Sequence, residues 1–395
     1  MKNYAAVFLM ICALVLSGCR NETSPAPAAS EPSDENTADE LKERTFPASK
    51  EYVKLTGRTV EENGIRWLIH SASKAEFKMK GTNASAVIQS DNSVTGEEQY
   101  MARIAVYING ERTLDHIVRQ KEETLELFSS EEEKEVEISI VKLSEAANSV
   151  VGIKEIQVRS SGDIEPLPAK ARKIEFIGDS VTCGYGVDDE VASHIFSTAT
   201  EDATKAYAYK TAEALDADYS LFCFSGYGIV SGYTSDGSCN YSMLVPPIYE
   251  ILGKTNGLCE PVINLSAEWN FSEFVPDEIV INLGTNDDSY TKDDPEKEED
   301  FIRLYVEFLK TVRRDNPDAR ITASLGIMRD TLYPAVAEAV KRYIAETGDE
   351  NVSALHFAPQ DGSTGYAVDG HPTEATHAIA AKTLVDHLSK PFLAN

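Results

Sequence analysis

The sequence predicts an α/β domain built on a parallel sheet, preceded by an all-β sandwich. Up to about residue 165 the chain reads as short β segments separated by turn residues, and after it apolar strands alternate with helices. The later strands are near-continuous apolar runs, which is typical of a parallel sheet covered on both faces. The proline-containing segment 165–170 (EPLPAK) marks the expected boundary, with the sandwich over residues 50–165 and the α/β domain over 170–395.

The sandwich is predicted from seven β segments and their turns. Alternation of apolar and polar residues is clearest over 102–108 and 135–143, and Asn109-Gly110 is a strong turn signal. The acidic run at 131–137 favours a solvated strand edge or loop over a binding site. The segments are 59–71, 75–81, 84–90, 100–110, 123–129, 135–144 and 153–160.

The second half carries five expected strands and four expected helices. The helix expected over 299–314 has one stripe of aromatic and aliphatic residues, which indicates a core-facing side rather than a ligand platform. The expected strands are Ile174–Ile177, Tyr219–Phe224, Glu278–Leu283, Arg320–Leu325 and Ala354–Phe357, and the expected helices are Lys205–Ala214, Glu299–Arg314, Leu332–Glu346 and Glu374–Leu388.

The N-terminus is predicted to carry a targeting signal. Residues 1–19 have a positive residue, an apolar core too short to span a bilayer, and Leu16-Ser17-Gly18-Cys19 at the end. This resembles a bacterial lipoprotein signal with lipid on Cys19, and the alternative is a plain secretory peptide. Residues 20–49, rich in Pro, Ala, Ser and Glu, are predicted to be a disordered tether. We therefore expect a protein outside the cytoplasm, lipid-anchored to a bacterial membrane.

Charge and cysteine content limit the partners. A formal net charge of -28 excludes nucleic acid as an expected partner, because a phosphate backbone would repel this surface. Outside the cytoplasm the four cysteines beyond Cys19 allow three pairings, and Cys239–Cys259 is favoured because these two flank one long loop. No zinc-binding spacing is present, so neither a metal nor a cofactor is expected.

Polar and glycine-rich blocks follow three of the five strands expected in the second half. Gly178-Asp179-Ser180 ends the first strand of the α/β half, 225–228 (SGYG) ends the second, and 284–287 (GTND) ends the third. His371 stands in 368–372 (VDGHP), just before the last helix. Each block alone is consistent with a turn or a helix cap, but open α/β sheets keep their chemistry at these strand ends.

In this order the blocks resemble the SGNH (GDSL-type) hydrolases, a flavodoxin-like three-layer fold. With Gly57-Arg58-Thr59, 178–186 (GDSVTCGYG) and 269–271 (WNF), the chain from about residue 50 onward resembles carbohydrate esterase family 2. That resemblance implies a jelly-roll-like first domain and removal of O-acetyl groups from plant polysaccharides such as xylan and glucomannan. An acetylated polysaccharide or oligosaccharide is then the expected substrate.

The motif residues can be given chemical roles. Ser180 would attack the acetyl carbonyl and form an acetyl-enzyme, with His371 taking its proton. The oxyanion would be held by the N–H of Ser180, the N–H of Gly228 or Gly226, and the Asn286 amide. Asp369 is expected to orient His371, and its carboxylate is favoured narrowly over its own carbonyl.

Substrate binding is the least specific part of the prediction. The chain has Gly370 where some relatives carry a sugar-stacking Trp, so Trp269 and Tyr185 are the candidates, with Tyr227 and Tyr233 after them. Two other functions stay open: an esterase acting on lipid or on O-acetyl peptidoglycan, and a carbohydrate-binding lipoprotein without catalysis.

Overall fold

The computed structural model of the chain describes residues 40–256 and 262–390. Its C-terminal part holds a sheet of five parallel strands in the order β12-β11-β13-β14-β15. All five predicted strands are present, and the α/β prediction is confirmed. Their bounds are β11 Arg172–Gly178, β12 Ala217–Cys223, β13 Glu278–Asn282, β14 Arg320–Ile327 and β15 Val352–Pro359.

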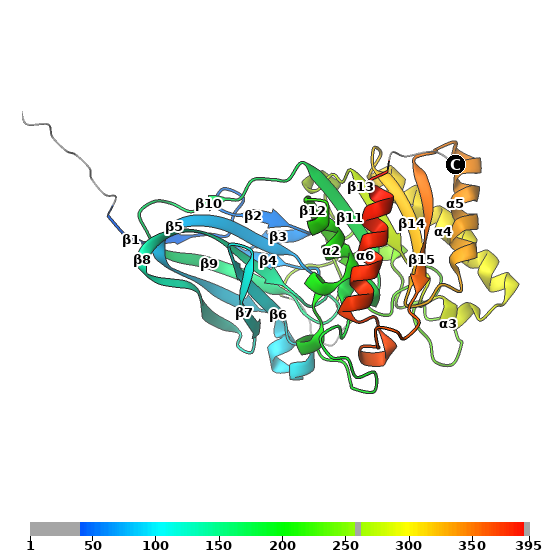
Figure 1. Cartoon of the computed structure of the whole chain (residues 1–395), viewed down its shortest axis with the longest axis horizontal. Helices are drawn as coiled ribbons and strands as arrows, with labels where there is room; N and C mark the ends of the chain where they lie inside the picture. Colours follow the sequence, from blue (N-terminus) through cyan, green and yellow to red (C-terminus); the bar gives the residue numbers. More distant parts are fainter. Residues whose placement is uncertain (1–39, 257–261, 391–395) are drawn as a thin grey trace, which may run out of the picture. The chain divides into compact units, whose positions relative to one another are not determined.

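Helices cover both faces of this sheet, giving three layers (Figure 1). Helices α2 (Tyr207–Ala214) and α6 (Glu374–Leu388) pack together on one face, and α4 (Pro295–Asp315) and α5 (Tyr333–Thr347) on the other. The apolar stripe of α4 lies in the core against β13 and β14, as predicted. Two one-turn helices, α1 (Ser180–Cys183) and α3 (Asp288–Thr291), follow β11 and β13.

Short 3-10 helices occur in the connections of the described chain. They carry little of the core, but the last of them leads directly into His371. They are η1 Asn92–Thr95, η2 Glu98–Tyr100, η3 Thr198–Thr200, η4 Ala203–Lys205, η5 Pro246–Ile248, η6 Phe271–Glu273 and η7 Val368–Gly370.

The N-terminal part is one antiparallel sheet of ten strands that curls on itself (Figure 1). The two layers of the expected sandwich are thus connected, because β5 and β8 are long strands that take part in both. Each was predicted as two strands, but register shifts near Gly81 and Asn83 bend the pair without breaking it. The strands are β1 Lys42–Phe46, β2 Lys54–Thr56, β3 Thr59–Glu62, β4 Ile65–Leu68, β5 Lys74–Ser90, β6 Arg103–Ile108, β7 Glu111–Ile117, β8 Glu122–Lys142, β9 Val151–Ser160 and β10 Glu165–Pro166.

Two sequence expectations in this part are corrected. The predicted tether reached residue 49, but residues 42–46 form β1, which pairs with β9 and buries Phe46 opposite Ile156. Residues 111–117 form β7, which was not predicted as a separate strand because its charged residues hide the alternation. The acidic run 131–137 lies within β8, where most of its side chains are exposed.

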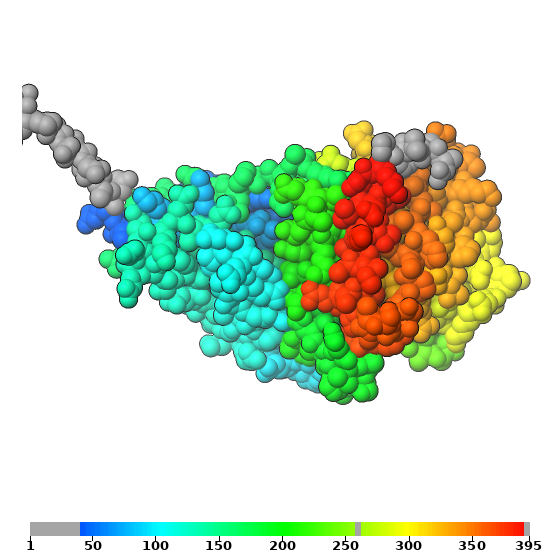
Figure 2. Space-filling view, viewed as in Figure 1, coloured from blue at the N-terminus to red at the C-terminus, as the bar shows by residue number. Residues whose placement is uncertain are grey.

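The two sheets share one hydrophobic core, and the described residues fall in a single compact unit. Trp67, Ile69 and Val150 from the N-terminal part pack in the same cluster as Phe222 and Val245 from the C-terminal part. On the face shown in Figure 2, the two parts touch along their border without a gap. The N-terminal sheet therefore packs against the α/β half and is not an independent domain joined by a linker.

Residues 1–39 lie outside the described chain, so the predicted signal, the lipidated Cys19 and most of the tether stay predictions. Within residues 40–256 and 262–390, no helix combines the length and apolar character that crossing a bilayer requires.

Candidate active site

The polar motifs meet where the strand order reverses. The connection after β11 leads to β12 on one side of it, and the connection after β13 leads to β14 on the other side, so the strand order reverses between β11 and β13. Open α/β sheets have a crevice at such a point. Ser180 follows β11 and Asn286 follows β13, which brings residues 106 positions apart to one edge.

Local sequence fixes the turn that presents Ser180. A side chain at Gly178 would come within 2.0 Å of Thr182 Oγ1, so only glycine allows the strand to enter α1 this tightly. Asp179 then caps the helix, its carboxylate accepting from the Val181 N–H at 3.0 Å. This bond braces the turn, and Ser180 is only 5% exposed.

Ser180 and His371 are hydrogen-bonded. Ser180 Oγ lies 2.8 Å from His371 Nε2, and His371 Nδ1 lies 2.9 Å from the main-chain carbonyl oxygen of Val368. Because a carbonyl can only accept, Nδ1 carries the proton and Nε2 is left with a lone pair. The ring is therefore held in the tautomer that can take the proton of Ser180.

The expected role of Asp369 is wrong in both of its forms. The group that orients His371 is the carbonyl of Val368, three residues before the histidine, and neither the carboxylate nor the carbonyl of Asp369. Asp369 has a left-handed backbone (φ 54°), and its carboxylate makes no hydrogen bond to the imidazole. Its carboxylate accepts instead from the hydroxyl of Tyr185 at 2.9 Å.

Burial tunes the histidine. Desolvation of its ring lowers the pKa of His371 to about 4, while the Val368 carbonyl and the charge of Asp369 act in the opposite direction. The imidazole is neutral at neutral pH, the form that a general base requires.

Three hydrogen-bond donors face the same pocket as Ser180. Among the described residues, the N–H groups of Ser180 and Gly226 have no hydrogen-bond acceptor, and both residues line the pocket. The Asn286 amide also lines it and donates to the Tyr227 carbonyl at 2.9 Å and to Asp179 at 3.3 Å. The weaker of these two bonds can be exchanged for an oxyanion.

The preference for Gly228 over Gly226 is corrected. The Gly228 N–H donates to the carbonyl of Met243 at 3.1 Å, and Gly228 does not line the pocket. A side chain there would come within 2.1 Å of the Ser231 carbonyl, so this glycine is required by close packing of the loop. Gly226 lines the pocket with φ 82°, a left-handed conformation that glycine adopts readily, and its N–H has no acceptor among the described residues.

Asp287 holds the loop that carries Gly226. Its fully buried carboxylate accepts from the N–H groups of Ile229, Val230 and Ser231 at 2.7–3.1 Å. Burial raises the pKa of Asp287 to about 6, against the effect of these three bonds. Asp287 is therefore a structural residue, and no linear pattern in the sequence shows which loop it holds.

The pocket has a volume of about 780 Å³, within the range of small-molecule sites. Tyr185 and the exposed Tyr233 line it, whereas Tyr227 is buried in the core. Trp269 is not part of its wall. That half-buried ring packs against the core, with the buried Arg58 guanidinium 5.3 Å from its centroid, so the structure does not place Trp269 at this pocket and its sugar-binding role stays a prediction.

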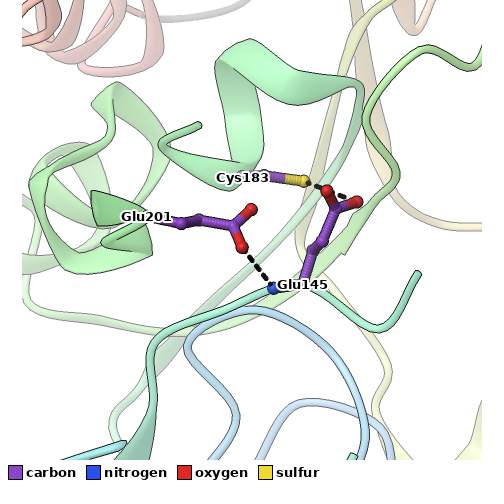
Figure 3. Close-up of side chains that lie close together, drawn as sticks. All are labelled: Glu145, Cys183 and Glu201. Atoms are coloured by element: carbon purple, nitrogen blue, oxygen red, sulfur yellow. Dashed lines mark hydrogen bonds between the residues drawn. The ribbon is translucent and has the colours of Figure 1, made fainter. Parts of the chain in front are cut away.

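One group of described residues has the donor set of a metal site (Figure 3). Glu145, Cys183 and Glu201 are fully buried, and their potential ligand atoms lie within 4.8 Å of one another. The sequence gave no sign of this group because its members come from three distant segments. Burial raises the pKa of both Glu145 and Glu201, which favours a proton among these groups, and the buried Lys142 lies close enough to lower both values.

The cluster touches the reaction site through the backbone. Glu145 accepts from the N–H of Ser225, next to Gly226, at 2.8 Å, and from the Cys183 thiol on the nucleophile helix at 3.7 Å. Cys183 and Cys223 are buried free thiols, and Cys239 forms no disulfide with any other described residue. The favoured pairing of Cys239 stays a prediction, because Cys259 lies outside the described residues.

Comparison with known proteins agrees with this geometry. Residues 176–379 match the model of the GDSL-like lipase/acylhydrolase family, and residues 55–168 match that of the carbohydrate esterase 2 N-terminal domain. The chain belongs to the GDSL-like lipase/acylhydrolase family. Its N-terminal match places it among the family 2 carbohydrate esterases, so the resemblance drawn from the motifs is confirmed.

Three relatives of this esterase family illustrate the likeness. The cellulase/esterase CelE of Acetivibrio thermocellus is 31% identical over 80% of the chain, which spans only 36% of that protein. An acetylxylan esterase/glucomannan deacetylase of Cellvibrio japonicus is 26% identical over 98% of both chains. A family two carbohydrate esterase from Clostridium thermocellum, solved in complex with cellohexaose, has 30% identity and a TM-score of 0.73, with coverage of 85% and 98%.

Proposed function

We propose that this esterase removes O-acetyl groups from plant cell-wall polysaccharides by a serine mechanism. The observation that carries the proposal is the 2.8 Å bond between Ser180 Oγ and the lone-pair nitrogen of His371, in a pocket that also presents three oxyanion donors. The names of the Cellvibrio relatives, acetylxylan esterase and glucomannan deacetylase, support the substrate class.

The first half-reaction follows from the geometry. Ser180 Oγ attacks the acetyl carbonyl carbon as its proton passes to His371 Nε2, giving a tetrahedral oxyanion. The N–H groups of Ser180 and Gly226 and the Asn286 amide donate to that oxyanion. Collapse breaks the bond to the sugar oxygen, which leaves as an alcohol with the proton from His371, and the acetyl group stays on Ser180.

The second half-reaction repeats these roles with water. His371 takes a proton from a water molecule, whose oxygen attacks the acetyl carbon on Ser180. The second oxyanion uses the same donors, and its collapse releases acetate and returns the proton to Ser180 Oγ. Since Val368 offers His371 only a neutral carbonyl, the base and nucleophile form a dyad supported by the backbone.

The test compares acetate release from acetylated xylan, acetylated glucomannan and O-acetylated peptidoglycan by the wild type and Ser180→Ala. Release from the plant polysaccharides by the wild type alone supports the proposal. Release from peptidoglycan alone would reassign the substrate, and binding to xylan without acetate release would favour the non-catalytic carbohydrate-binding function.

We also propose that the esterase is exported and anchored by lipid on Cys19, with residues 20–39 as a tether. The support is the Leu16-Ser17-Gly18-Cys19 pattern after a short apolar core. Cys19→Ala should move the protein out of the membrane fraction or leave its signal uncleaved. A wild type that is fully soluble and carries no lipid would contradict the anchor.

A further inference from the structure

The histidine of this site lacks the negative partner that usually stabilises its charged form. When Ser180 attacks, His371 becomes an imidazolium, and a neutral carbonyl on Nδ1 stabilises that charge less well than a carboxylate does. The carboxylate nearest in sequence, Asp369, is bonded to Tyr185. Tyr185 therefore connects the unused acid with the histidine.

Tyr185 lies face to face with the imidazole. The ring centroids of Tyr185 and His371 are 4.3 Å apart with an interplanar angle of 29°, and Phe196 stacks on Tyr185 at 4.1 Å and 16°. A cation over an aromatic face is attracted by the negative charge of that face. The His371 ring becomes a cation only as it gains a proton, so the attraction grows in the transition state.

The backbone is built to place this tyrosine. Gly184 and Gly186, on either side of Tyr185, have φ 75° and 62°. A side chain at Gly186 would come within 2.6 Å of Val368 Cβ, the residue whose carbonyl holds His371. The Gly-Tyr-Gly turn thus fits directly against the histidine loop, and a bulkier residue would push the two apart.

Asp369 completes the arrangement from the far end of the ring. Its left-handed backbone is an uncommon conformation for a residue other than glycine. The peptide is fixed there by the bond from the Asp369 N–H to the Ala192 carbonyl at 3.0 Å. In this conformation the carboxylate lies against the Tyr185 hydroxyl and accepts a hydrogen bond from it. That bond adds electron density to the phenol ring.

We propose that Tyr185 and Asp369 act together as positioning residues that replace the acid of a triad, stabilising the His371 imidazolium through the face of the Tyr185 ring. The inference rests on the proposed esterase function. It assigns to the Gly184-Tyr185-Gly186 segment a role in proton transfer, beyond the wall of the pocket.

The experiment breaks the connection at each of its two ends. Tyr185→Phe keeps the ring and removes the hydroxyl, and Asp369→Asn keeps the shape and an acceptor but removes the charge. Each should lower kcat on 4-nitrophenyl acetate by about threefold to tenfold with KM within about twofold, the range of a cation–π contribution. Because the two residues act in series, the double variant should lose no more than the larger single loss.

The pH profile of kcat/KM gives a readout that a merely structural role would not move. Without the Asp369 charge, the acid limb that reports His371 should shift to lower pH in Asp369→Asn. Lys292 and Arg329 also line the pocket and His377 lies close by, and all three are kept in these variants. Tyr366→Phe, which removes a hydroxyl from the same loop outside the pocket, is the matched control and should match the wild type.

Several results would overturn the proposal. Unchanged kcat in both single variants would reduce Tyr185 to pocket lining, and additive losses in the double variant would separate the two residues. A loss of about 10³-fold or more in Asp369→Asn alone would show direct action as a triad acid. Failure of the esterase function itself looks different, because the wild type would then not hydrolyse the ester.

Discussion

The two halves of the reaction site are held by different forces. Ser180 and Asn286 follow buried strands, and the carboxylates of Asp179 and Asp287 tie their turns down through backbone N–H groups. His371 stands in a loop, held by one main-chain carbonyl and by ring stacking. The nucleophile side is thus fixed by buried carboxylates that accept from backbone N–H groups, and the histidine side by a main-chain carbonyl and ring contacts.

This difference teaches where the site tolerates change. Buried acceptors cannot be removed without leaving unpaired N–H groups, which cost about 1–3 kcal/mol each. The stabilisation from ring stacking decreases gradually, because the rings stay partly stacked when one of them moves by a small distance. Four predictions test the comparison, from the largest effect to the smallest.

Ser180→Ala breaks the nucleophile side completely. With no Oγ to form the acetyl-enzyme, kcat on 4-nitrophenyl acetate should fall by about 10⁴-fold or more, as serine hydrolases lose on removal of the nucleophile. The melting temperature should not change, because the bonds of Asp179 are to the backbone. Ser363→Ala, in an exposed loop, is the control, and substantial turnover left in Ser180→Ala would refute the mechanism.

Asn286→Ala removes one oxyanion donor and leaves the dyad. We expect kcat to fall by about 10²–10³-fold with a small effect on KM, the usual cost of one donor. Asn286→Asp keeps the shape but replaces the donating amide by an acceptor, so it should lose at least as much. An effect on KM alone would mean that the amide binds the ground state of the substrate.

Glu145 tests whether the N-terminal sheet supports the nucleophile side. Glu145→Ala leaves the buried Ser225 N–H without its acceptor, which should destabilise the fold by about 1–3 kcal/mol and lower kcat by roughly tenfold as the Gly226 loop loosens. Glu145→Gln keeps an oxygen acceptor and should recover most of both losses. If the Gln and Ala variants behaved alike, the charge rather than the bond would be the important feature.

The histidine side sets the pH dependence. Since burial lowers the pKa of His371 to about 4, its neutral form persists through mildly acidic pH and is lost as the pH falls through that value. We expect kcat/KM to be level from neutral pH down to about 5 and to fall below it. Activity measured under conditions where the fold is intact checks this, and an acid limb near 6.5 would show a solvated imidazole instead.

The ends of the strands could be predicted from the sequence, but the contacts between the residues at those ends could not. Ser180 and Asn286 were found because each stands two residues after a glycine that ends an apolar strand, and His371 because its block comes just before the last helix. Three-layer order followed from the alternation of strands and helices, since this period reflects burial directly. The ends of the helices were predicted within a few residues for the same reason.

The errors share one physical origin. The partner of His371 was sought in a side chain because a spacing can be counted, whereas a main-chain carbonyl has no sequence signature. Gly228 and Gly226 differ only in which N–H is already paired, and that depends on Met243 in another segment. Trp269 was expected at the pocket because no local pattern separates a ring that packs on Arg58 from one that lines the pocket.

The shared core has a consequence for anyone who wishes to move this enzyme between proteins. A construction that cut the chain at the EPLPAK segment would strip the Gly226 loop of its anchor at Glu145 and uncover Phe222 and its neighbours. The unit that can be transferred is thus the whole of residues 40–390, and a fusion to another protein is best made before β1. The match to the much longer cellulase/esterase extends over 321 residues, which is more than either part contains alone.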